Sequence, residues 1–176
     1  MNKAIRSVQL PLSKDTVSEL HIGEELLLSG TMLVGRDQVH EQFQILLNEG
    51  KALPVSLEDE TIFYMGPAPA PEGAVIGSCG PTTSSRMDSF TPDLLDAGLV
   101  GMIGKGPRSF AVQESVKRNG AVYFYAFGGC GALYAQKVES IECIAFQEFG
   151  PEALYRITVK DFPVIVAMDS SGRTIL

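Results

Sequence analysis

The sequence predicts an α/β fold, with a parallel sheet in the middle of the chain and added β structure at both ends. Between residues 74 and 136, short apolar runs alternate with segments of helical periodicity, which is typical of βαβ units. The last third contains three strand-like runs with no helix between them. No repeat or second-domain linker divides the 176 residues, so we expect one domain over residues 1–176.

The first 71 residues carry a separate signal for each element. About 25 residues alternate weakly, as a strand followed by a loop does, and residues 24–29 (EELLLS) predict a buried strand that ends at Gly30-Thr31. A helix opens at residues 36–40, because Val39 and Phe43 begin one apolar helical face that Gly50 terminates. Residues 61–65 predict a strand, and the sequence GPAPAP at 66–71 predicts a loop.

From residue 74 onward, predicted strands and helices alternate. The predicted strands in this part cover residues 74–78, 99–103 and 122–126, and the predicted helices cover residues 88–97, 110–118 and 131–136. Gly98 ends the first of these helices. Three further strands, at residues 140–146, 155–159 and 163–168, complete the chain.

The charge of the chain restricts its partners. A net charge of −7 argues against nucleic acid or an anionic membrane as the main partner. The longest apolar runs, residues 98–104 and 162–168, are far shorter than the ~20 residues of a membrane span. No charged, apolar and small-residue signal pattern opens the sequence. We therefore expect a cytoplasmic protein that acts without a membrane or nucleic acid.

The three cysteines, Cys79, Cys130 and Cys143, fit reduced thiols better than a metal site. An odd number without a secretion signal argues against a disulfide framework, and no C-x2-C pair is present. Cys143 lies in an alternating segment, where a small buried thiol is the simpler interpretation. We expect structural cysteines.

Three glycine-containing segments follow predicted strands and should meet at one edge of the sheet. They are residues 77–83 (GSCGPTT), 104–106 (GKG) and 127–131 (FGGCG). Ligands of open parallel sheets bind beyond the carboxyl ends of the strands. Backbone N–H groups, hydroxyls, Arg86 and Lys105 suit an anion there. Neither nucleotide fingerprint is complete, so the sequence favours a small acid over a nucleotide phosphate.

The same segments carry a family resemblance. The string GPTTSSRMDSF (80–90) is followed by PDLL (92–95), GMIGKG (101–106), GGCGAL (128–133) and DFP (161–163). Together with Gly30-Thr31, the GRD of residues 35–37 and His40, they resemble the class I, iron–sulfur-dependent fumarate hydratases. The match is to their C-terminal domain, which in many organisms is a separate β subunit. Cys130 departs from the pattern, because the family has alanine there.

The resemblance implies a hydro-lyase that reversibly hydrates fumarate to L-malate. It implies a hetero-oligomer with a fumarase α subunit, and leaves open whether this domain also forms a dimer. It implies a [4Fe–4S] cluster held by that α subunit and not by this chain, so no metal ligands are expected here. The implied fold is a three-layer swivelling β/β/α domain with a parallel central sheet and an additional antiparallel sheet.

The resemblance also assigns roles to particular residues. Arg36, Arg86 and Lys105 bind the substrate carboxylates and stabilise developing charge, with Thr83 beside them, and Thr82 takes the place of the proposed catalytic base. Arginine suits this task because its planar fork matches a carboxylate. A threonine hydroxyl is a weak base and needs a neighbour to accept its proton or cations to stabilise the alkoxide. An aspartate of the α subunit is the alternative acceptor.

Simpler interpretations of the charged residues stay open at this point. Arg86 alone fits a surface cation paired with Asp88, and Asp37 fits an acid at a helix start. His40 fits an exposed helix residue or one that supports the site indirectly. Two other functions also remain: the β subunit of an L(+)-tartrate dehydratase, and a binding module of the same fold without catalysis. Asp88 and the DFP sequence favour fumarase over tartrate dehydratase.

Overall fold

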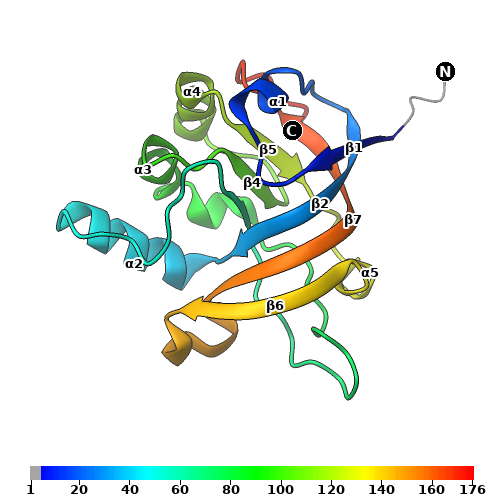
Figure 1. The fold of residues 1–176 in the computed structure, drawn as a ribbon. Coiled ribbons are helices and arrows are strands. Elements are labelled where there is room, and N and C mark those ends of the chain that lie inside the picture. The colour runs from blue at the N-terminus through cyan, green and yellow to red at the C-terminus, as the bar shows by residue number, and fades with distance from the viewer. Residues whose placement is uncertain (1–4) are drawn as a thin grey trace.

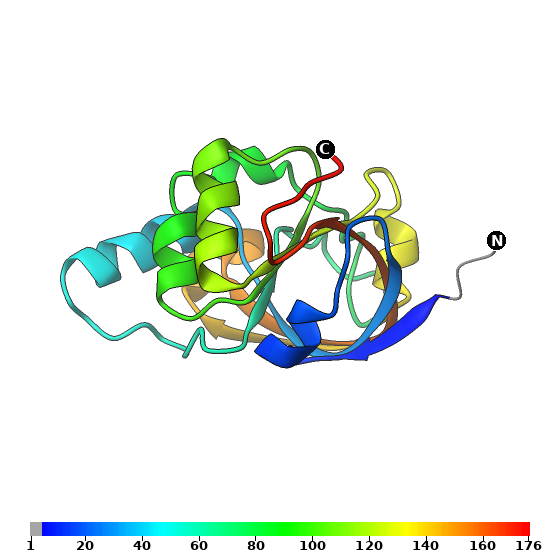
Figure 2. The ribbon, with the colours of Figure 1, turned by 90° about the horizontal axis from the view of Figure 1, so that it is seen from above.

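The strands form one sheet that closes on itself (Figures 1 and 2). The computed structural model describes residues 5–176, in which the strand order is β1-β2-β3-β4-β5-β7-β6 and β2 also pairs with β7. That extra pairing joins β2, β3, β4, β5 and β7 into a ring, with β1 and β6 at its outside edges. The strands are β1 (Arg6–Gln9), β2 (Glu25–Val34), β3 (Thr61–Phe63), β4 (Gly101–Gly104), β5 (Val122–Tyr125), β6 (Val138–Ala145) and β7 (Leu154–Met168).

The prediction of an α/β fold with a parallel centre is confirmed. Strands β1 to β5 pair in parallel, and β7 runs antiparallel to β2, β5 and β6. The antiparallel strands belong to the same sheet, however, and form no separate one. The reason is the length of β7: its 15 residues pair with β2 along one edge and with β6 and then β5 along the other.

The sheet has an apolar core on each of its faces. Phe63, Ile103 and Phe124 point into the ring, whereas their neighbours Ile62, Met102 and Tyr123 belong to a second core against the helices. This division follows from the two-residue period of a strand. The helices are α1 (Lys14–Ser18), α2 (Asp37–Asn48), α3 (Thr91–Asp96), α4 (Phe110–Asn119) and α5 (Gly131–Ala135), with 3₁₀ turns at Ser84–Met87 and Gln147–Glu152. Helices α2, α3 and α4 lie side by side over the second core (Figure 1).

Two predicted strand ends are wrong, because in each case the strand continues through an irregular residue. Strand β2 continues through Gly30, where φ is +124° and a Cβ atom would lie 2.4 Å from the Leu10 carbonyl oxygen. The segments 155–159 and 163–168 form the single strand β7, and Asp161 is a bulge within it. Its φ of 51° is accommodated because its N–H donates to Ser29 Oγ over 3.0 Å. Both irregularities therefore lie where β2 and β7 change register.

Two predicted elements of the middle region also differ. Residues 74–78 form no strand; they fold back on the proline-rich loop, where the Ala68 N–H donates to the Ser78 carbonyl over 3.0 Å. The helix predicted over residues 88–97 begins only at Thr91, with Pro92 in its first turn. The strand that precedes the GPTTSSR sequence is therefore absent, although the segment still reaches the predicted edge of the sheet.

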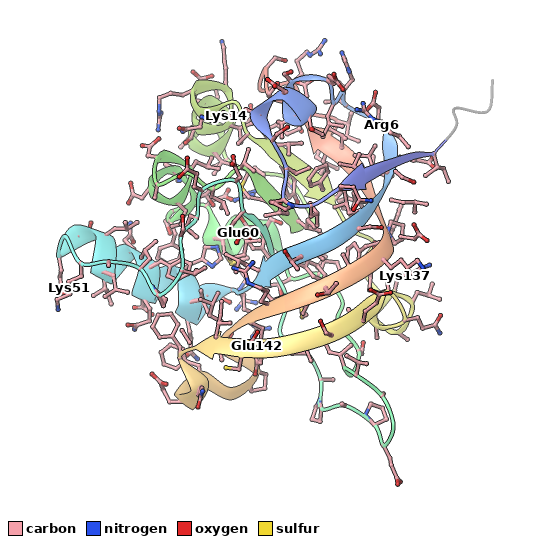
Figure 3. The ribbon with its side chains drawn as sticks, viewed as in Figure 1. Arg6, Lys14, Lys51, Glu60, Lys137 and Glu142 are labelled. Carbon is pink, nitrogen blue, oxygen red and sulfur yellow. The ribbon has the colours of Figure 1, made fainter. Side chains whose placement is uncertain are left out.

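Charged side chains surround this core. Arg6, Lys14, Lys51 and Lys137 come from distant parts of the chain and lie around the periphery (Figure 3). No helix within residues 5–176 has both the length and the apolar character that a membrane crossing requires.

Candidate active site at the carboxyl edge of the parallel strands

The predicted site residues lie at the carboxyl ends of three adjacent parallel strands. Arg36 is the second residue after β2, and Lys105 directly follows β4. Thr82 reaches the same edge because its N–H donates to the carbonyl of Tyr64, the residue after β3, over 2.7 Å. The expectation that the glycine-containing segments meet at one edge of the sheet is thus confirmed. We call this edge the rim.

Backbone pairing holds the GPTTSSR segment against the GKG segment. Thr83 and Lys105 form a parallel β-bridge, and the Ser84 N–H donates to the Lys105 carbonyl over 2.9 Å. Gly104 must be glycine, because a Cβ there would lie 2.0 Å from Ser84 Oγ. The side chain of Thr82 is half-buried and that of Thr83 is exposed. Neither hydroxyl has a hydrogen-bond partner within residues 5–176, so both remain available to a ligand.

The side chain of Lys105, the middle residue of the GKG segment, lies against the glycine loop that follows β5. A Cβ on Gly128 would lie 3.7 Å from Lys105 Nζ, so the ammonium group rests against glycine backbone. The glycine loop of residues 127–131 is joined to residues 77–83 by the Cys79 N–H, which donates to the Gly131 carbonyl over 3.2 Å. Among the described residues, no carboxylate lies within ion-pair distance of Lys105. This cation is therefore free to meet an anion.

The two arginines of the site are connected through Asp37. Arg86 donates from Nε to Asp37 Oδ1 over 2.9 Å and from Nη2 to Oδ2 over 2.6 Å. Asp37 Oδ2 also lies 3.7 Å from Arg36 Nε, which in turn donates to Glu152. The simpler interpretation that Arg86 pairs with Asp88 is wrong. Asp37 likewise does more than begin a helix.

Asp88 pairs instead with Arg108, a residue that the sequence reasoning missed. The Arg108 side chain is fully buried and donates from Nε to Asp88 Oδ1 over 2.7 Å. It also donates to Thr91 Oγ1 over 2.7 Å and packs on the rings of Tyr64 and Tyr123, 5.4 and 5.0 Å from their centroids. This buried cation ties the GPTTSSRMD segment to the GKGPRS segment. The sequence held one signal for this pair, because Asp88 directly follows the GPTTSSRM sequence and Arg108 directly follows the GKGP sequence.

His40 is buried beneath the rim and is not the exposed helix residue considered from the sequence. Its Nδ1 lies 2.8 Å from the Arg36 carbonyl oxygen, and since a carbonyl only accepts, Nδ1 carries the proton. Its Nε2 has no partner within residues 5–176, and the ring meets Tyr64 edge-on at 5.2 Å. Burial lowers the pKa of His40 from 6.5 to about 4, against the opposing effect of the Arg36 hydrogen bond.

The low pKa of His40 predicts acid sensitivity of the folded domain. Because the pKa is about 6.5 unfolded and about 4 folded, the unfolded chain binds more protons between these values. The free energy of unfolding should therefore fall as pH drops from 6.5 to 4, by roughly 3 kcal/mol from this residue. Urea unfolding across this pH range should show a smaller fall for His40→Gln. His21→Gln, at the other and exposed histidine, is the control, and equal pH dependence in both variants would contradict the assignment.

The cysteines form no cluster site in the part of the chain that the structure describes. Cys79 is buried and its thiol donates to the Gly131 carbonyl, while Cys143 lies on β6. Burial raises the pKa of the Cys79 thiol to about 12, which makes it a poor ligand. Residues 5–176 contain no group of three His, Cys, Asp or Glu side chains that could hold a metal ion. The donor set of the described residues, 5–176, does not fit an iron–sulfur cluster.

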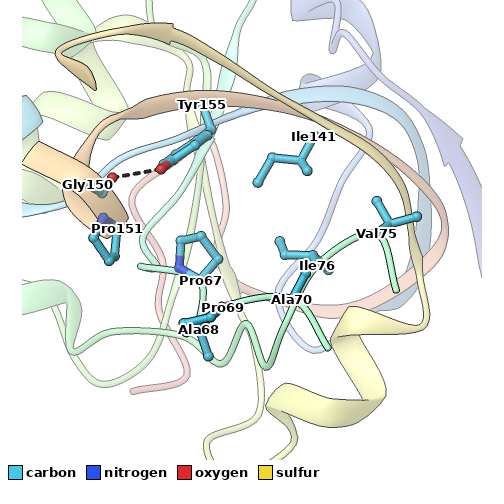
Figure 4. A pocket seen from close by; sticks show the side chains of 10 residues that line it. All are labelled: Pro67, Ala68, Pro69, Ala70, Val75, Ile76, Ile141, Gly150, Pro151 and Tyr155. Atoms are coloured by element: carbon cyan, nitrogen blue, oxygen red, sulfur yellow. Dashed lines mark hydrogen bonds between the residues drawn. The ribbon is translucent and has the colours of Figure 1, made fainter. Parts of the chain in front are cut away.

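A separate cavity of about 360 Å³ lies between the proline-rich loop and strands β6 and β7 (Figure 4). The proline-rich loop, Ile141 and Tyr155 line it, and Tyr155 Oη donates to the Gly150 carbonyl over 2.7 Å. Its walls are apolar, and none of Thr82, Arg86 or Lys105 contributes to it. A small dianion needs cations and N–H donors, so the rim is the better candidate for the active site. The rim can bind carboxylates and stabilise negative charge that develops on them.

Comparison with known proteins identifies a family to which the chain is similar. Residues 1–176 match the family model described as "Fumarase C-terminus". The chain is 38% identical over 174 residues to "Fumarate hydratase class I, aerobic" of Escherichia coli (strain K12), a match that covers 98% of this chain and 31% of that protein. It is 36% identical over 162 residues to "Fumarate hydratase 2" of Leishmania major, covering 90% of this chain and 28% of that protein.

A shorter relative matches along most of its own length. The chain is 34% identical over 170 residues to "Putative L(+)-tartrate dehydratase subunit beta" of Methanocaldococcus jannaschii, covering 93% of this chain and 87% of that protein. By contrast, the chain spans less than a third of the two fumarate hydratases.

Proposed function

The chain belongs to the fumarase C-terminus family, and from this premise we propose that it is the β subunit of a two-subunit hydro-lyase that interconverts fumarate and L-malate. In this proposal the chain supplies the carboxylate-binding side of the active site. The observation that carries it is the rim, where Arg36 follows β2, Lys105 follows β4, and Arg86 lies in the 3₁₀ turn just after two free threonine hydroxyls. The names of the relatives, fumarate hydratase and tartrate dehydratase, support the hydro-lyase class.

The three cations suit the charge that this reaction develops. Dehydration of L-malate removes a proton from the carbon next to one carboxylate and expels hydroxide from the neighbouring carbon. Negative charge then accumulates on the carboxylate beside the carbon that loses its proton. Arg86 and Lys105 are proposed to hold this carboxylate, and Arg36 contributes to binding of the dianion. Fixed cations lower the barrier because they are already oriented when the charge appears.

Thr82 is proposed to accept the proton in dehydration and to return it in hydration. A threonine hydroxyl is intrinsically a poor base, so its oxygen needs cations that stabilise the alkoxide or a neighbour that takes its proton. The bridge between Thr83 and Lys105 brings the backbone of Lys105 next to this turn, and the ammonium group of Lys105 is proposed as the cation that stabilises the alkoxide. Thr83, the exposed neighbour, is proposed to contribute a hydrogen bond to the substrate. An acid of the partner subunit is the alternative proton acceptor.

The partner subunit is proposed to hold the [4Fe–4S] cluster. The donor set of residues 5–176 does not fit the cluster, and the fumarate hydratase relatives contain more than two thirds of their length outside the matched region. The tartrate dehydratase relative, which is named as a subunit, supports an arrangement in two chains. We propose that the complex works in the cytoplasm.

Purification of the chain alone gives the first test. We expect a folded, colourless protein without iron or sulfide and without hydratase activity, because the cysteines do not form a ligand set. Absorption spectra and iron and sulfide analysis measure this directly. Co-expression with a cluster-bearing partner subunit should then yield a complex that converts L-malate to fumarate. A brown preparation of the single chain with stoichiometric iron and sulfide would overturn the proposal that the partner subunit holds the cluster.

L(+)-tartrate dehydration is the second candidate function, favoured by the similarity to the M. jannaschii protein. Tartrate carries one hydroxyl more than malate, and both are dianions that three cations suit equally. Assays of the same complex on L-malate, fumarate and L(+)-tartrate separate the two functions. Turnover of tartrate alone would replace the fumarase assignment, and tight binding of either acid without turnover would favour a non-catalytic module.

A further inference from the structure

Asp37 occupies a position that its role as a helix-start residue does not explain. Its carboxylate accepts two hydrogen bonds from Arg86 and lies 3.7 Å from Arg36 Nε. Arg36 Nε also donates to Glu152 Oε1, and the other oxygen of Glu152 accepts from Gln38 Nε2 over 2.6 Å. Two acids and two arginines thus alternate along one chain of contacts. Both guanidinium groups can lie close together because the acids offset their mutual repulsion.

The contacts occupy only one side of each guanidinium group. An arginine has five N–H donors. Arg86 uses its Nε–H and one N–H of Nη2, and Arg36 uses its Nε–H. The edge formed by Nη1 and Nη2 has a second pair of parallel donors, which suits another carboxylate. Within residues 5–176, the Nη1 atoms of both arginines have no acceptor. The Arg86 and Arg36 side chains are 49% and 29% exposed, so a ligand can reach these edges.

We propose that Asp37 and Glu152 are positioning residues, which hold Arg86 and Arg36 by their Nε sides so that the free Nη edges face the substrate dianion. The inference rests on the proposed function, since it assigns a purpose to the orientation of arginines that bind substrate. It goes beyond that function because neither acid touches the substrate in this scheme. Each acid fixes the direction in which the planar guanidinium group points. A carboxylate can accept two hydrogen bonds from that group only in one relative orientation.

The proposal predicts a change opposite in sign to simple electrostatics. Replacing Asp37 by asparagine removes a negative charge close to the site of a dianion. Coulomb attraction alone would then strengthen binding and lower KM. If Asp37 positions Arg86, the loss of its charge-assisted hydrogen bonds frees the guanidinium group and weakens binding instead. The sign of the change in KM therefore separates the two effects.

The test uses the reconstituted complex with a fully loaded cluster and L-malate as substrate. We expect Asp37→Asn to raise KM by about 10-fold to 100-fold, the factor that a charge-assisted hydrogen bond is worth. Asp37→Glu, which keeps the charge, should recover part of the loss. Asp93→Asn is the matched control, because Asp93 lies in the first turn of α3 as Asp37 does in that of α2. It should behave as the parent, and an unchanged or lower KM for Asp37→Asn would overturn the proposal.

A second measurement needs only the chain itself and is independent of turnover. In the ¹⁵N-labelled chain, the Nε–H signal of Arg86 should be protected from solvent exchange by Asp37 and lose that protection in Asp37→Asn. The buried Nε–H of Arg108, which Asp88 holds, serves as internal reference and should not change. An Arg86 signal that is equally protected in both proteins would exclude the positioning role. Loss of protection together with an inactive parent complex would instead leave the positioning role intact and refute the proposed reaction.

Discussion

The Thr82→Val substitution should lower kcat of the reconstituted enzyme by about 10²–10⁴-fold, the usual contribution of a positioned base. Valine keeps the β-branched shape and so preserves the backbone, including the hydrogen bond from the Thr82 N–H to the Tyr64 carbonyl. Only the oxygen is lost. Because the cations of the rim remain, KM should change much less than kcat. Steady-state kinetics with L-malate and a fully loaded cluster measure both constants.

Two companion variants identify which hydroxyl acts. Thr82→Ser keeps the oxygen and should retain partial activity, since it loses only the methyl group that restricts the rotamer. Thr83→Val should be milder than Thr82→Val, although the exposed Thr83 lies in the bridge to Lys105. If Thr82→Val turns over within a few-fold of the parent, the base lies elsewhere, and an acid of the partner subunit becomes the leading candidate.

Arg86→Lys should cost about 10²-fold or more in kcat/KM, even though the charge is kept. Lysine cannot hold Asp37 with one side and offer a two-pronged edge to a substrate carboxylate with the other. Losing two charge-assisted hydrogen bonds of roughly 1.5–3 kcal/mol each accounts for an effect of this size. Assays of the variant complex at saturating and subsaturating L-malate measure it.

Arg118→Lys is the matched control for this change. Arg118 also pairs with an aspartate, Asp96, but the pair lies on the exposed surface between α4 and α3. Surface pairs contribute little, so this variant should keep the activity of the parent. Near-normal turnover of Arg86→Lys, equal to that of the control, would remove Arg86 from the site.

The sequence predicts the fold best where periodicity is strong and worst where a single residue decides whether a strand continues. The amphipathic face of α2, with Val39 and Phe43, and the alternation of strands and helices gave the correct class. Gly30 and the segment around Asp161 suggested breaks, because glycine and aspartate are uncommon inside strands. Here a bulge in the long β2–β7 pairing absorbs both. The closure of the sheet depends on this pairing of distant segments, which no local sequence pattern predicts.

The site was predictable to the extent that motifs follow strands. Parallel strands bring their carboxyl ends to one edge, so the segments with Thr82 and Lys105 could be placed together before the structure was known, whereas Arg36 was assigned only through the family resemblance. The ion-pair partners of the charged residues could not be predicted from the sequence. Arg86 is 49 residues from Asp37, and Arg108 is 20 residues from Asp88 in sequence. Ion pairs at such separations depend on tertiary packing, whereas the sequence suggested only the nearby pair of Arg86 with Asp88 as an alternative.

A crystal structure of the complex between the Thr82→Val chain and its cluster-bearing partner, with fumarate bound, tests the central claim most directly. The slow variant should retain the ligand because its cations are unchanged. We predict one fumarate carboxylate within hydrogen-bonding distance of the Nη atoms of Arg86 and of Lys105 Nζ, with Arg86 still held by Asp37. Fumarate bound away from the rim, with these cations in contact only with protein groups, would contradict the account.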